Sequence, residues 1–395
     1  MAVQKMRSYE EALEIINRLP VSLTAEMVDL TACLGRVLAK NVLSDTDMPP
    51  FNKSAMDGYA CRFSDLSGIL KIVEELPAGK KPQKKIGPGQ CARIMTGGMI
   101  PEGADFVLMK EHAVIQGDLV RCVVEPGSSN ICCQGEDVRE GDVVVPAGAK
   151  LLPAHVAMLA ATGCIMPEVY KTPEVAIIST GTELTEPDVK PGSGRIRNSN
   201  GYQILAQCIQ YGAITSYLGI VEDEKDKISH IISSALESFK VILVSGGVSV
   251  GDYDYIPDVL KELGAETLFH GLNMKPGKHF LLARKEDRYI ACLPGNPVSS
   301  YVIFEVFVRP LLNRLTGCIE PLRRMLMPLE SSYKRKKSDS LFFIPVRITW
   351  QGTALPLEYH GSAHIQAYTM ADGIMEVPEG ISEYYKGQLV YVRPV

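Results

Sequence analysis

The stretch that decides the fold is KVILVSGGVSVGDYDY (240–255), in which a run of apolar residues leads directly into a loop of glycine and serine. The same change occurs at EVAIISTGTEL (174–184), and ITSYLGIV (214–221) has the composition of a further buried strand. Strands that alternate with helices predict a parallel sheet with helices on both faces. The helices are predicted over 200–212, 228–239 and about 255–263.

The glycine-rich loops indicate where such a sheet binds a ligand, because sites of this fold class lie beyond the carboxyl ends of the strands. Three glycines and two serines within 245–251 let the backbone close around an anion. This loop is not a P-loop, since no Gly-Lys-Ser/Thr follows it. The turn STGTEL (179–184) can hold a phosphate, and Glu183 can hold its magnesium. An ordinary turn with a capping threonine is the alternative interpretation of that segment.

A third loop, NMKPGKHF (273–280), carries two positive charges. Its Pro-Gly turn presents Lys275 and Lys278 on the same side, which suits an anionic substrate. The alternative is a solvated surface turn.

The fourth loop, LPGNPVS (293–299), precedes a long helix predicted over 298–315. Pro294 and Pro297 restrict the backbone, and Asn296 can either cap the helix or contact a ligand.

The rest of the chain predicts additional domains around this sheet. Ser8 and Glu11 form a capping box for a helix over 9–19, and a small helix fits 152–162. Short Val- and Ile-rich runs separated by turns predict a β domain that begins with the loop PPFNKSAMDGYA (49–60). The predicted fold class is therefore α/β plus β, with a doubly wound mixed or parallel sheet domain, a β-rich insertion and a C-terminal β-barrel-like domain. Their predicted bounds are 1–47 with 142–172 (linking N-terminal and helical region), 48–141 (β-rich), 173–318 (α/β) and 319–395 (C-terminal).

Composition narrows the class of protein. The 395 residues include 41 Lys+Arg against 46 Asp+Glu, a formal charge of -5 that argues against a general nucleic-acid binder. The longest uncharged stretch, 151–167, is interrupted by proline, histidine and glycine, so no membrane span is predicted. Ten cysteines without a C-x-x-C spacing argue against a disulfide scaffold or a zinc finger. The N-terminus lacks the apolar region of a signal peptide, and we expect a cytoplasmic protein.

The motifs together, in their order, resemble the MoeA family of molybdopterin molybdenumtransferases. The resemblance runs from about residue 8 to the C-terminus. It rests on PPFNKSAMDGYA, RIMTGGMIPEGADFVLMKE (93–111), GEDVREGDVVVPAG (135–148), STGTEL, RIRNSN (195–200), SGGVSVGDYDY, MKPGK and LPGNPVS.

The family resemblance implies an L-shaped homodimer, in which the sheet domain, similar to the molybdopterin adenylyltransferase fold, faces the β domain of the partner subunit. It implies an enzyme that inserts molybdate into adenylylated molybdopterin, with magnesium and release of AMP. Molybdopterin adenylyltransferase and apo-molybdoenzymes are the implied partners beyond the dimer.

The predicted site combines the loops with residues carried over from the resemblance. The predicted catalytic residues are acidic: Asp57, Asp137, Glu183, Asp223 and Asp254. The predicted substrate-binding residues are Thr96, Ser179, Thr180, Gly181, Ser245, Gly246, Gly247, Ser249, Gly251, Lys275, Lys278, Pro294, Asn296, Pro297 and Ser362. Clustered carboxylates repel an anionic substrate unless a cation lies between them, so Glu183 and Asp254 are the predicted Mg²⁺ ligands. For each acidic residue, a helix cap or a surface ion pair is the alternative.

Three departures from the family pattern concern lost positive charge. Cys132 and Cys133 stand where the family has an arginine-rich stretch, Gly271 replaces a basic residue, and only Arg347 remains near the arginine pattern of the last domain. Fewer guanidinium groups mean fewer bidentate contacts to an oxyanion. A paralogue that binds the pterin nucleotide without inserting metal is therefore the alternative function, and an adenylyltransferase acting on the pterin is a third.

Overall fold

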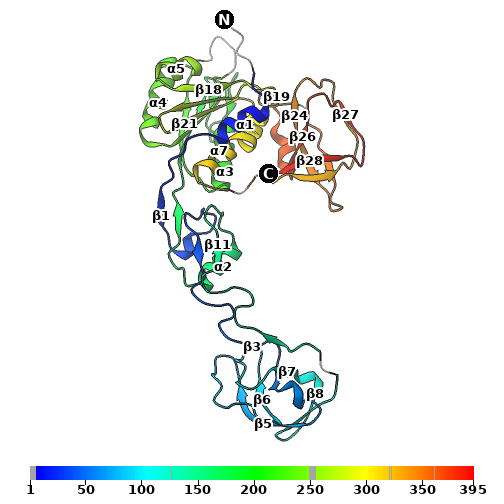
Figure 1. The fold of residues 1–395 in the computed structure, drawn as a ribbon. Coiled ribbons are helices and arrows are strands. Elements are labelled where there is room, and N and C mark those ends of the chain that lie inside the picture. Colours follow the sequence, from blue (N-terminus) through cyan, green and yellow to red (C-terminus); the bar gives the residue numbers. More distant parts are fainter. Residues whose placement is uncertain (1–5, 126, 249–254, 320, 322, 360) are drawn as a thin grey trace.

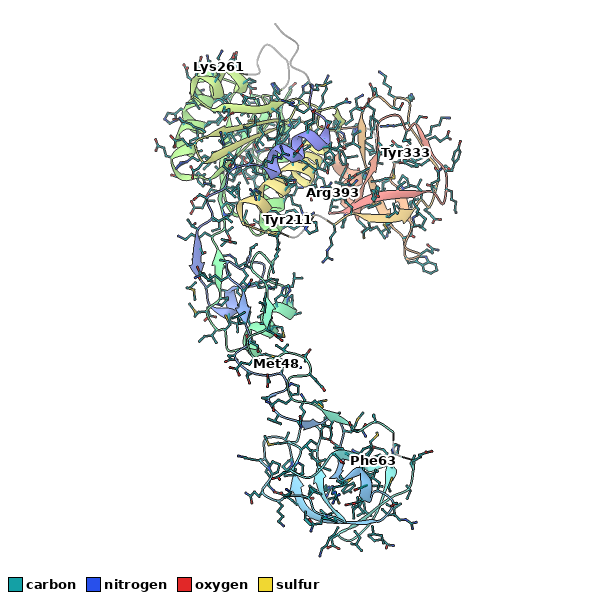
Figure 2. The ribbon with its side chains drawn as sticks, viewed as in Figure 1. Met48, Phe63, Tyr211, Lys261, Tyr333 and Arg393 are labelled. Atoms are coloured by element: carbon teal, nitrogen blue, oxygen red, sulfur yellow. The ribbon has the colours of Figure 1, made fainter. Side chains whose placement is uncertain are left out.

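The computed structural model describes residues 6–125, 127–248, 255–319, 321, 323–359 and 361–395. The chain is elongated (Figure 1). A sheet domain, which contains β13 to β21, lies beside a C-terminal domain at one end, and a β-rich domain lies at the other. A narrow neck that contains Met48 leads to the β-rich domain (Figure 2). No helix among these residues is both long and apolar enough to cross a bilayer.

The sheet domain contains a six-stranded mixed sheet in the order β16-β13-β17-β21-β20-β18. The first four strands are parallel, as the alternation of strands and helices predicts, and the last two add an antiparallel edge. The strands are β13 (Glu174–Thr180), β16 (Ile214–Val221), β17 (Val241–Ser245), β18 (Glu266–His270), β20 (Leu281–Lys285) and β21 (Arg288–Leu293).

Helices cover both faces of this sheet because alternate residues of each central strand point to opposite sides. Val175 and Ile177 of β13 belong to the core under α1 (Tyr9–Asn17) and α3 (Asn200–Gln210). Ala176 and Ile178 belong to the core under α4 (Lys225–Ser238) and α5 (Ile256–Glu262). All four residues are fully buried, and burying each larger one contributes roughly 1.5–3 kcal/mol. The predicted helices and the capping box of Ser8 and Glu11 are confirmed.

The predicted long helix over 298–315 contains a π-helical turn. It consists of α6 (Pro297–Ile303), the π-helix η4 (Phe304–Val308) and α7 (Arg309–Leu315). Pro310 has no N–H to donate within a helix, and the wider turn directly before it accommodates this missing bond. Glu305 in that turn is 1% exposed and accepts hydrogen bonds from Gln207 and Tyr211.

The β-rich domain is a six-stranded sheet in the order β7-β4-β6-β5-β9-β8. Its strands are β4 (Gly58–Cys61), β5 (Ile69–Leu76), β6 (Gln90–Ile94), β7 (Phe106–Met109), β8 (Ala113–Gln116) and β9 (Leu119–Cys122). The prediction of a loop over 49–60 is wrong in part, because β3 (Lys53–Ser54) and the start of β4 lie within it. Gly58 is a strand residue: a Cβ there would lie 2.0 Å from the carbonyl oxygen of Leu108.

Short paired strands and one helix link the two ends of the molecule. β1 (Ala25–Met27) pairs with β12 (Glu168–Tyr170), and β2 (Val42–Leu43) pairs with β11 (Val143–Val145). The predicted small helix is α2 (Pro153–Ala161). Nine of the ten cysteines, all except Cys318, are free thiols in the described part of the chain.

The C-terminal domain contains the sheet β19-β24-β26-β28-β22, with β25 paired to β24. Its strands are β22 (Met325–Pro328), β24 (Leu341–Ile348), β25 (Ala354–Pro356), β26 (Gly373–Val377) and β28 (Leu389–Pro394). The remaining strand, β19 (Met274–Lys275), comes from the sheet domain and pairs in parallel with β24. At the turn between β24 and β25, Trp350 is 92% exposed.

Buried charges fix the C-terminal domain against the sheet domain. Arg393 is 2% exposed and lies at the junction of the two domains (Figure 2). Its guanidinium forms an ion pair of 3.2 Å with Glu376 and donates to the hydroxyl of Tyr9 in α1. Breaking a buried ion pair leaves an uncompensated charge, so Arg393 keeps its partners in the folded protein. Since Arg393 lies in the last strand and Tyr9 in the first helix, the pairing ties these two elements together.

Candidate active site

The strand order places a topological switch point between β13 and β17. The chain passes from β13 to the outer strand β16 and then returns to β17 on the other side of β13. A cavity of about 540 Å³ opens there, at the carboxyl ends of both strands. We call it the glycine-loop cavity. Residues predicted for the site that line it are Thr180, Gly181, Glu183, Asp223, Ser245, Gly246, Gly247, Pro294, Asn296 and Pro297.

Two glycines of this cavity stand where a Cβ would meet a close neighbour, which is backbone in one case and a side chain in the other. Gly246 has a φ of 102°, and a Cβ at this position would lie 2.4 Å from the carbonyl oxygen of Thr180. Gly181 has a φ of 153°, and its Cβ would lie 2.7 Å from Oε2 of Glu183. Any larger residue would displace the loop after β17 or the carboxylate of Glu183.

The hydroxyl side chains of the strand ends do not all face the cavity. Thr180 and Ser245 line it, whereas Ser179 is fully buried and is not part of the lining. Neighbouring residues on a strand point to opposite faces, so only one of Ser179 and Thr180 can face a ligand. The Ser179 hydroxyl donates to Oδ1 of Asn198 at 3.2 Å.

Two of the predicted acidic residues meet in the cavity. Glu183 and Asp223 both line it, and Oδ2 of Asp223 accepts a hydrogen bond of 3.0 Å from the backbone N–H of Thr182. Asp254, Ser249 and Gly251 lie outside the described residues. Within the described ranges, no three His, Cys, Asp or Glu side chains are grouped so that they could hold a metal ion.

The two lysines line a second cavity, of about 310 Å³, that adjoins the first. We call it the lysine cavity. Lys275 and Lys278 lie on its wall, and His279, Pro294 and Asn296 line both cavities. Nζ of Lys275 forms an ion pair of 3.2 Å with Asp339, while Lys278 is exposed. Pairing of β19 with β24 brings Phe342 and Tyr359 of the C-terminal domain into the same wall.

Ser362 joins the boundary between the cavities to the C-terminal domain. Its hydroxyl accepts a hydrogen bond of 3.0 Å from Nδ2 of Asn296. Asn296 occupies the N-cap position of α6 but makes no side-chain capping bond. Of its two predicted roles, capping is therefore not the one that the structure shows.

Asp57 and Thr96 lie together in the β-rich domain, which is at the opposite end of the chain from the sheet domain and the C-terminal domain that line the two cavities (Figure 1). Oδ1 of Asp57 accepts from the N–H and the hydroxyl of Thr96, at 2.9 and 2.8 Å, and Oδ2 pairs with Lys110 at 3.1 Å. These bonds, led by the backbone N–H of Thr96, lower the pKa of Asp57 to about 2. Asp57 is therefore ionised at neutral pH.

Asp137 lies apart from the other predicted residues, in the neck. Its backbone N–H donates to the carbonyl of Met48 at 3.0 Å. Its side chain lines a separate cavity of about 630 Å³ together with Lys53, Cys132 and Glu136.

The structure adds Arg197, Asn198, Ser199, Asn200 and His279 to the glycine-loop cavity. Asn198, Ser199 and Asn200 stand at the start of α3, and a cluster of Asn and Ser before an apolar periodic run is a sequence signal for a helix N-terminus. The positive end of the α3 dipole therefore faces the cavity in which an anion is predicted.

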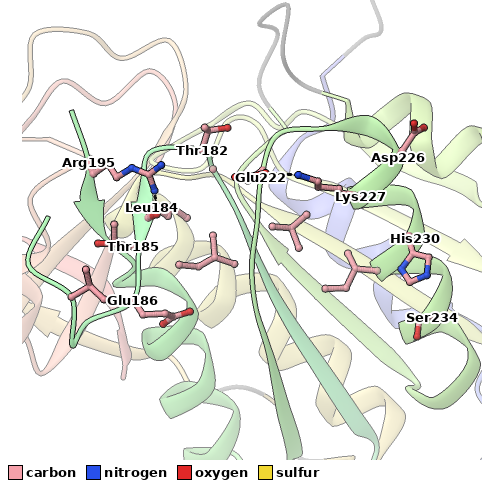
Figure 3. A pocket seen from close by; sticks show the side chains of 15 residues that line it. Thr182, Leu184, Thr185, Glu186, Arg195, Glu222, Asp226, Lys227, His230 and Ser234 are labelled. Carbon is pink, nitrogen blue, oxygen red and sulfur yellow. Dashed lines mark hydrogen bonds and ion pairs between the residues drawn. The ribbon is translucent and has the colours of Figure 1, made fainter. Parts of the chain in front are cut away.

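A fourth cavity, of about 990 Å³, lies at the outer edge of the sheet beside β16, and we call it the edge cavity. Glu186 and Arg195 enter it from one side, and His230 and Ser234 of α4 from the other (Figure 3). It shares Gly181 and Leu184 with the glycine-loop cavity.

Known proteins match this arrangement over nearly the whole chain. Residues 7–163 match the model of the MoeA N-terminal region (domains I and II), 176–314 a probable molybdopterin binding domain, and 330–395 the MoeA C-terminal region (domain IV). A molybdopterin molybdenumtransferase of Staphylococcus epidermidis is 31% identical over 99% of this chain and 97% of its own length. One from Staphylococcus aureus is 32% identical over 96% and 94%.

Solved structures show the same overall fold. The crystal structure of the molybdopterin biosynthesis MoeA protein from Pyrococcus horikoshii OT3 superposes with a TM-score of 0.84 at 28% identity, over 99% of this chain and 100% of that one. The family models, the two relatives and this structure agree with the resemblance found in the sequence motifs. The chain therefore belongs to the MoeA family.

Proposed function

We propose that this protein is a molybdopterin molybdenumtransferase, which inserts molybdate into adenylylated molybdopterin and releases AMP with the help of Mg²⁺. The observation that carries the proposal is the shared wall of the glycine-loop and lysine cavities, formed by His279, Pro294 and Asn296. A substrate with a pyrophosphate between two ring systems needs two adjoining compartments that both accept negative charge. The relatives named as molybdenumtransferases support this assignment of substrate.

Each compartment has its own means of holding an anion. In the glycine-loop cavity, flexible glycine backbone and the N-terminus of α3 offer N–H groups to phosphate oxygens. In the lysine cavity, Lys275 and Lys278 offer ammonium groups, which act as point charges on phosphate or molybdate. Lys278 is exposed and therefore available to a substrate oxygen.

The carboxylates in the glycine-loop cavity fit Mg²⁺ in the way that phosphate-binding sites usually hold it. Mg²⁺ is commonly bound through one or two carboxylates together with substrate phosphates. Glu183 and Asp223 supply two such carboxylates beside the glycine backbone, and Asp254 remains a predicted third ligand. Bound there, the ion would polarise a phosphoryl oxygen and neutralise charge on the leaving AMP. Without it, the two carboxylates would repel the same substrate.

We further propose that the protein works as a homodimer in the cytoplasm. Asp57 and Thr96 belong to the β-rich domain, at the opposite end of the chain from the sheet domain (Figure 1), so they can take part in the reaction only if a partner subunit brings them to its cavities. In this role, the protein would receive its substrate from a molybdopterin adenylyltransferase and pass its product to an apo-molybdoenzyme.

Reconstitution tests this function directly. The purified protein is mixed with adenylylated molybdopterin, molybdate and Mg²⁺, and AMP is measured by chromatography, with a chelator in a matched reaction. We expect AMP release that depends on both molybdate and Mg²⁺. Binding of the pterin nucleotide without AMP release would instead support the non-inserting paralogue. Adenylylation of molybdopterin from ATP would support the adenylyltransferase.

A further inference from the structure

A chain of hydrogen bonds runs from the outer edge of the sheet to the wall of the glycine-loop cavity. The carboxylate of Glu186 accepts from the hydroxyls of Tyr202 at 3.0 Å and Tyr217 at 2.8 Å. Tyr217 in turn accepts a bond of 2.7 Å from Nδ2 of Asn198, which lines the cavity. Glu186 itself lines the edge cavity (Figure 3), so the chain spans the wall between the two cavities.

The direction of each bond in this chain is fixed. Tyr217 has one hydroxyl proton, and a carboxylate can only accept, so the proton points to Glu186. The lone pairs of the hydroxyl are then left for the amide of Asn198. Burial, followed by the hydrogen bond to Glu186, raises the pKa of Tyr217, which keeps the phenol protonated at all physiological pH values.

Asn198 transmits this orientation to the first turn of α3. It is 1% exposed, and Nδ2 also donates to the hydroxyl of Ser179 at 3.0 Å. Its Oδ1 accepts a bond of 3.1 Å from the backbone N–H of Gly201. The first N–H groups of a helix have no partner within the helix, so Gly201 depends on Asn198 for this bond.

Glycine at position 201 is the only residue type that lets the start of α3 approach these side chains so closely. A Cβ at this position would lie 2.7 Å from Oγ of Ser179, 2.8 Å from Nδ2 of Asn198 and 2.9 Å from the ring of Tyr217. The start of α3 is therefore packed directly on the hydrogen-bonded side chains and must follow them if they shift.

The same turn of α3 forms part of the glycine-loop cavity. Ser199 and Asn200 line it, and Nδ2 of Asn200 donates to the hydroxyl of Ser245 at 2.9 Å and the carbonyl of Gly295 at 2.7 Å. The N–H groups at the start of α3 can bind an anion in the cavity only while the turn keeps this orientation. Small displacements of a positioned group cost much of its effect on a bound ligand.

We propose that Tyr217 is a positioning residue for the substrate site: held by Glu186, its hydroxyl orients Asn198 and thereby the first turn of α3 toward the bound phosphate. The inference rests on the proposed function for the identity of the substrate. Tyr217 does not line the glycine-loop cavity, whereas Asn198 and the first turn of α3 do.

Two phenylalanine variants separate positioning from general stability. Tyr217→Phe removes the hydroxyl that contacts both Glu186 and Asn198 but keeps the ring. Tyr202→Phe is the matched control, because it removes the other hydroxyl on Glu186 and leaves Asn198 untouched. We expect the KM for adenylylated molybdopterin to rise five- to twentyfold in Tyr217→Phe with kcat within twofold, and both constants to stay within twofold in Tyr202→Phe. Equal effects in the two variants, or a parallel loss of kcat with unchanged KM, would overturn the proposal.

Amide hydrogen exchange gives a second readout that needs no substrate. The N–H of Gly201 should exchange at least tenfold faster in Tyr217→Phe and within twofold of the wild type in Tyr202→Phe. Unchanged exchange in Tyr217→Phe would show that its hydroxyl does not position α3. If the wild type releases no AMP at all, the proposed function fails, while the exchange data still decide whether Tyr217 orients the turn.

Discussion

A single residue, Thr96, donates twice to one oxygen of Asp57, through its backbone N–H at 2.9 Å and its hydroxyl at 2.8 Å. Hydrogen bonds to a carboxylate favour its charged form, which is why the pKa of Asp57 falls to about 2 from an ordinary 3.8. The ionised side chain thus holds β4 and the segment after β6 together in the β-rich domain.

This low pKa predicts how the stability of the β-rich domain depends on pH. A carboxylate with a lowered pKa stabilises the fold above its ordinary value of 3.8, and this contribution is lost as the pH falls through about 2. The urea midpoint of the wild type should therefore exceed that of Asp57→Asn by a constant amount above pH 4, and the gap should close toward pH 2. Asp118→Asn, which loses only a surface ion pair to Lys71, serves as control. A gap that persists unchanged at pH 2 would contradict the assignment.

Removing the positive charge of the lysine cavity should weaken binding of anionic substrates. A direct, charge-assisted contact contributes on the order of 1.5–3 kcal/mol, so Lys278→Ala should raise the Kd for adenylylated molybdopterin about 10- to 100-fold in calorimetry. Lys275→Ala should act in the same direction and also free Asp339 from its ion pair. The control is Lys261→Ala, a change of equal charge on α5, outside both cavities (Figure 2). An equal rise of the Kd in all three variants would indicate that these lysines act only through long-range electrostatic attraction of the substrate.

Glu183 should matter for catalysis more than for binding. Glu183→Gln keeps the shape of the side chain but removes the charge that is proposed to hold Mg²⁺. We expect Mg²⁺-dependent AMP release to fall at least a hundredfold while the Kd for the pterin nucleotide stays within about tenfold, because the metal stabilises charge that develops in the transition state. Full turnover in this variant, or in the wild type with excess chelator, would remove Mg²⁺ from the mechanism.

Gly201 should be intolerant of even one methyl group. Gly201→Ala places a Cβ within 2.7–2.9 Å of Ser179, Asn198 and Tyr217, and overpacking of this kind costs about 1–3 kcal/mol. Gly192→Ala is the control, since nothing lies within 4 Å of its Cβ position. Urea unfolding should show a clear loss of stability in Gly201→Ala and almost none in Gly192→Ala. Equal urea midpoints would mean that the hydrogen-bonded side chains around residue 201 accommodate the methyl group without loss of stability.

The homodimer can be tested by light scattering. At micromolar concentration, the proposed state predicts a mass of twice the 43.2 kDa of one chain. Mixing Asp57→Asn with Glu183→Gln subunits provides a functional check, because a site shared between subunits would recover part of its activity in the mixed dimers. A monomeric mass would leave Asp57 without a route to the cavities.

The sequence predicts the sheet domain well because its signals are local. At β13 and β17, an apolar strand is followed directly by glycine, and both strands end at the cavity where the ligand loops were expected. The structure of the segment after β18 depends on contacts with residues that are distant in sequence. That Lys275 belongs to a strand of the C-terminal sheet depends on pairing with Phe342, which is distant in sequence and carries no turn signal.

Charged residues in the sequence predict burial less reliably than hydrophobic periodicity does. Arginine is rarely buried, yet Arg335 in the basic run 334–337 is 7% exposed and donates to the carbonyls of Ile381, Ser340 and Pro378. Buried guanidinium groups that satisfy backbone carbonyls leave no mark on local sequence patterns. Asn198 escaped prediction for a similar reason, because its partners Ser179 and Tyr217 meet only in the folded sheet.

The position of Trp350 has a consequence for spectroscopy. It is the only tryptophan of the chain, and it stands 92% exposed on the turn between β24 and β25. Indole in water already emits at long wavelength in the native protein, so unfolding should shift the emission very little. Fluorescence excited at the red edge of indole absorption would report on the tip of this one hairpin. A quencher or a macromolecule that touches the C-terminal domain should alter the emission even when every other part of the molecule is unaffected.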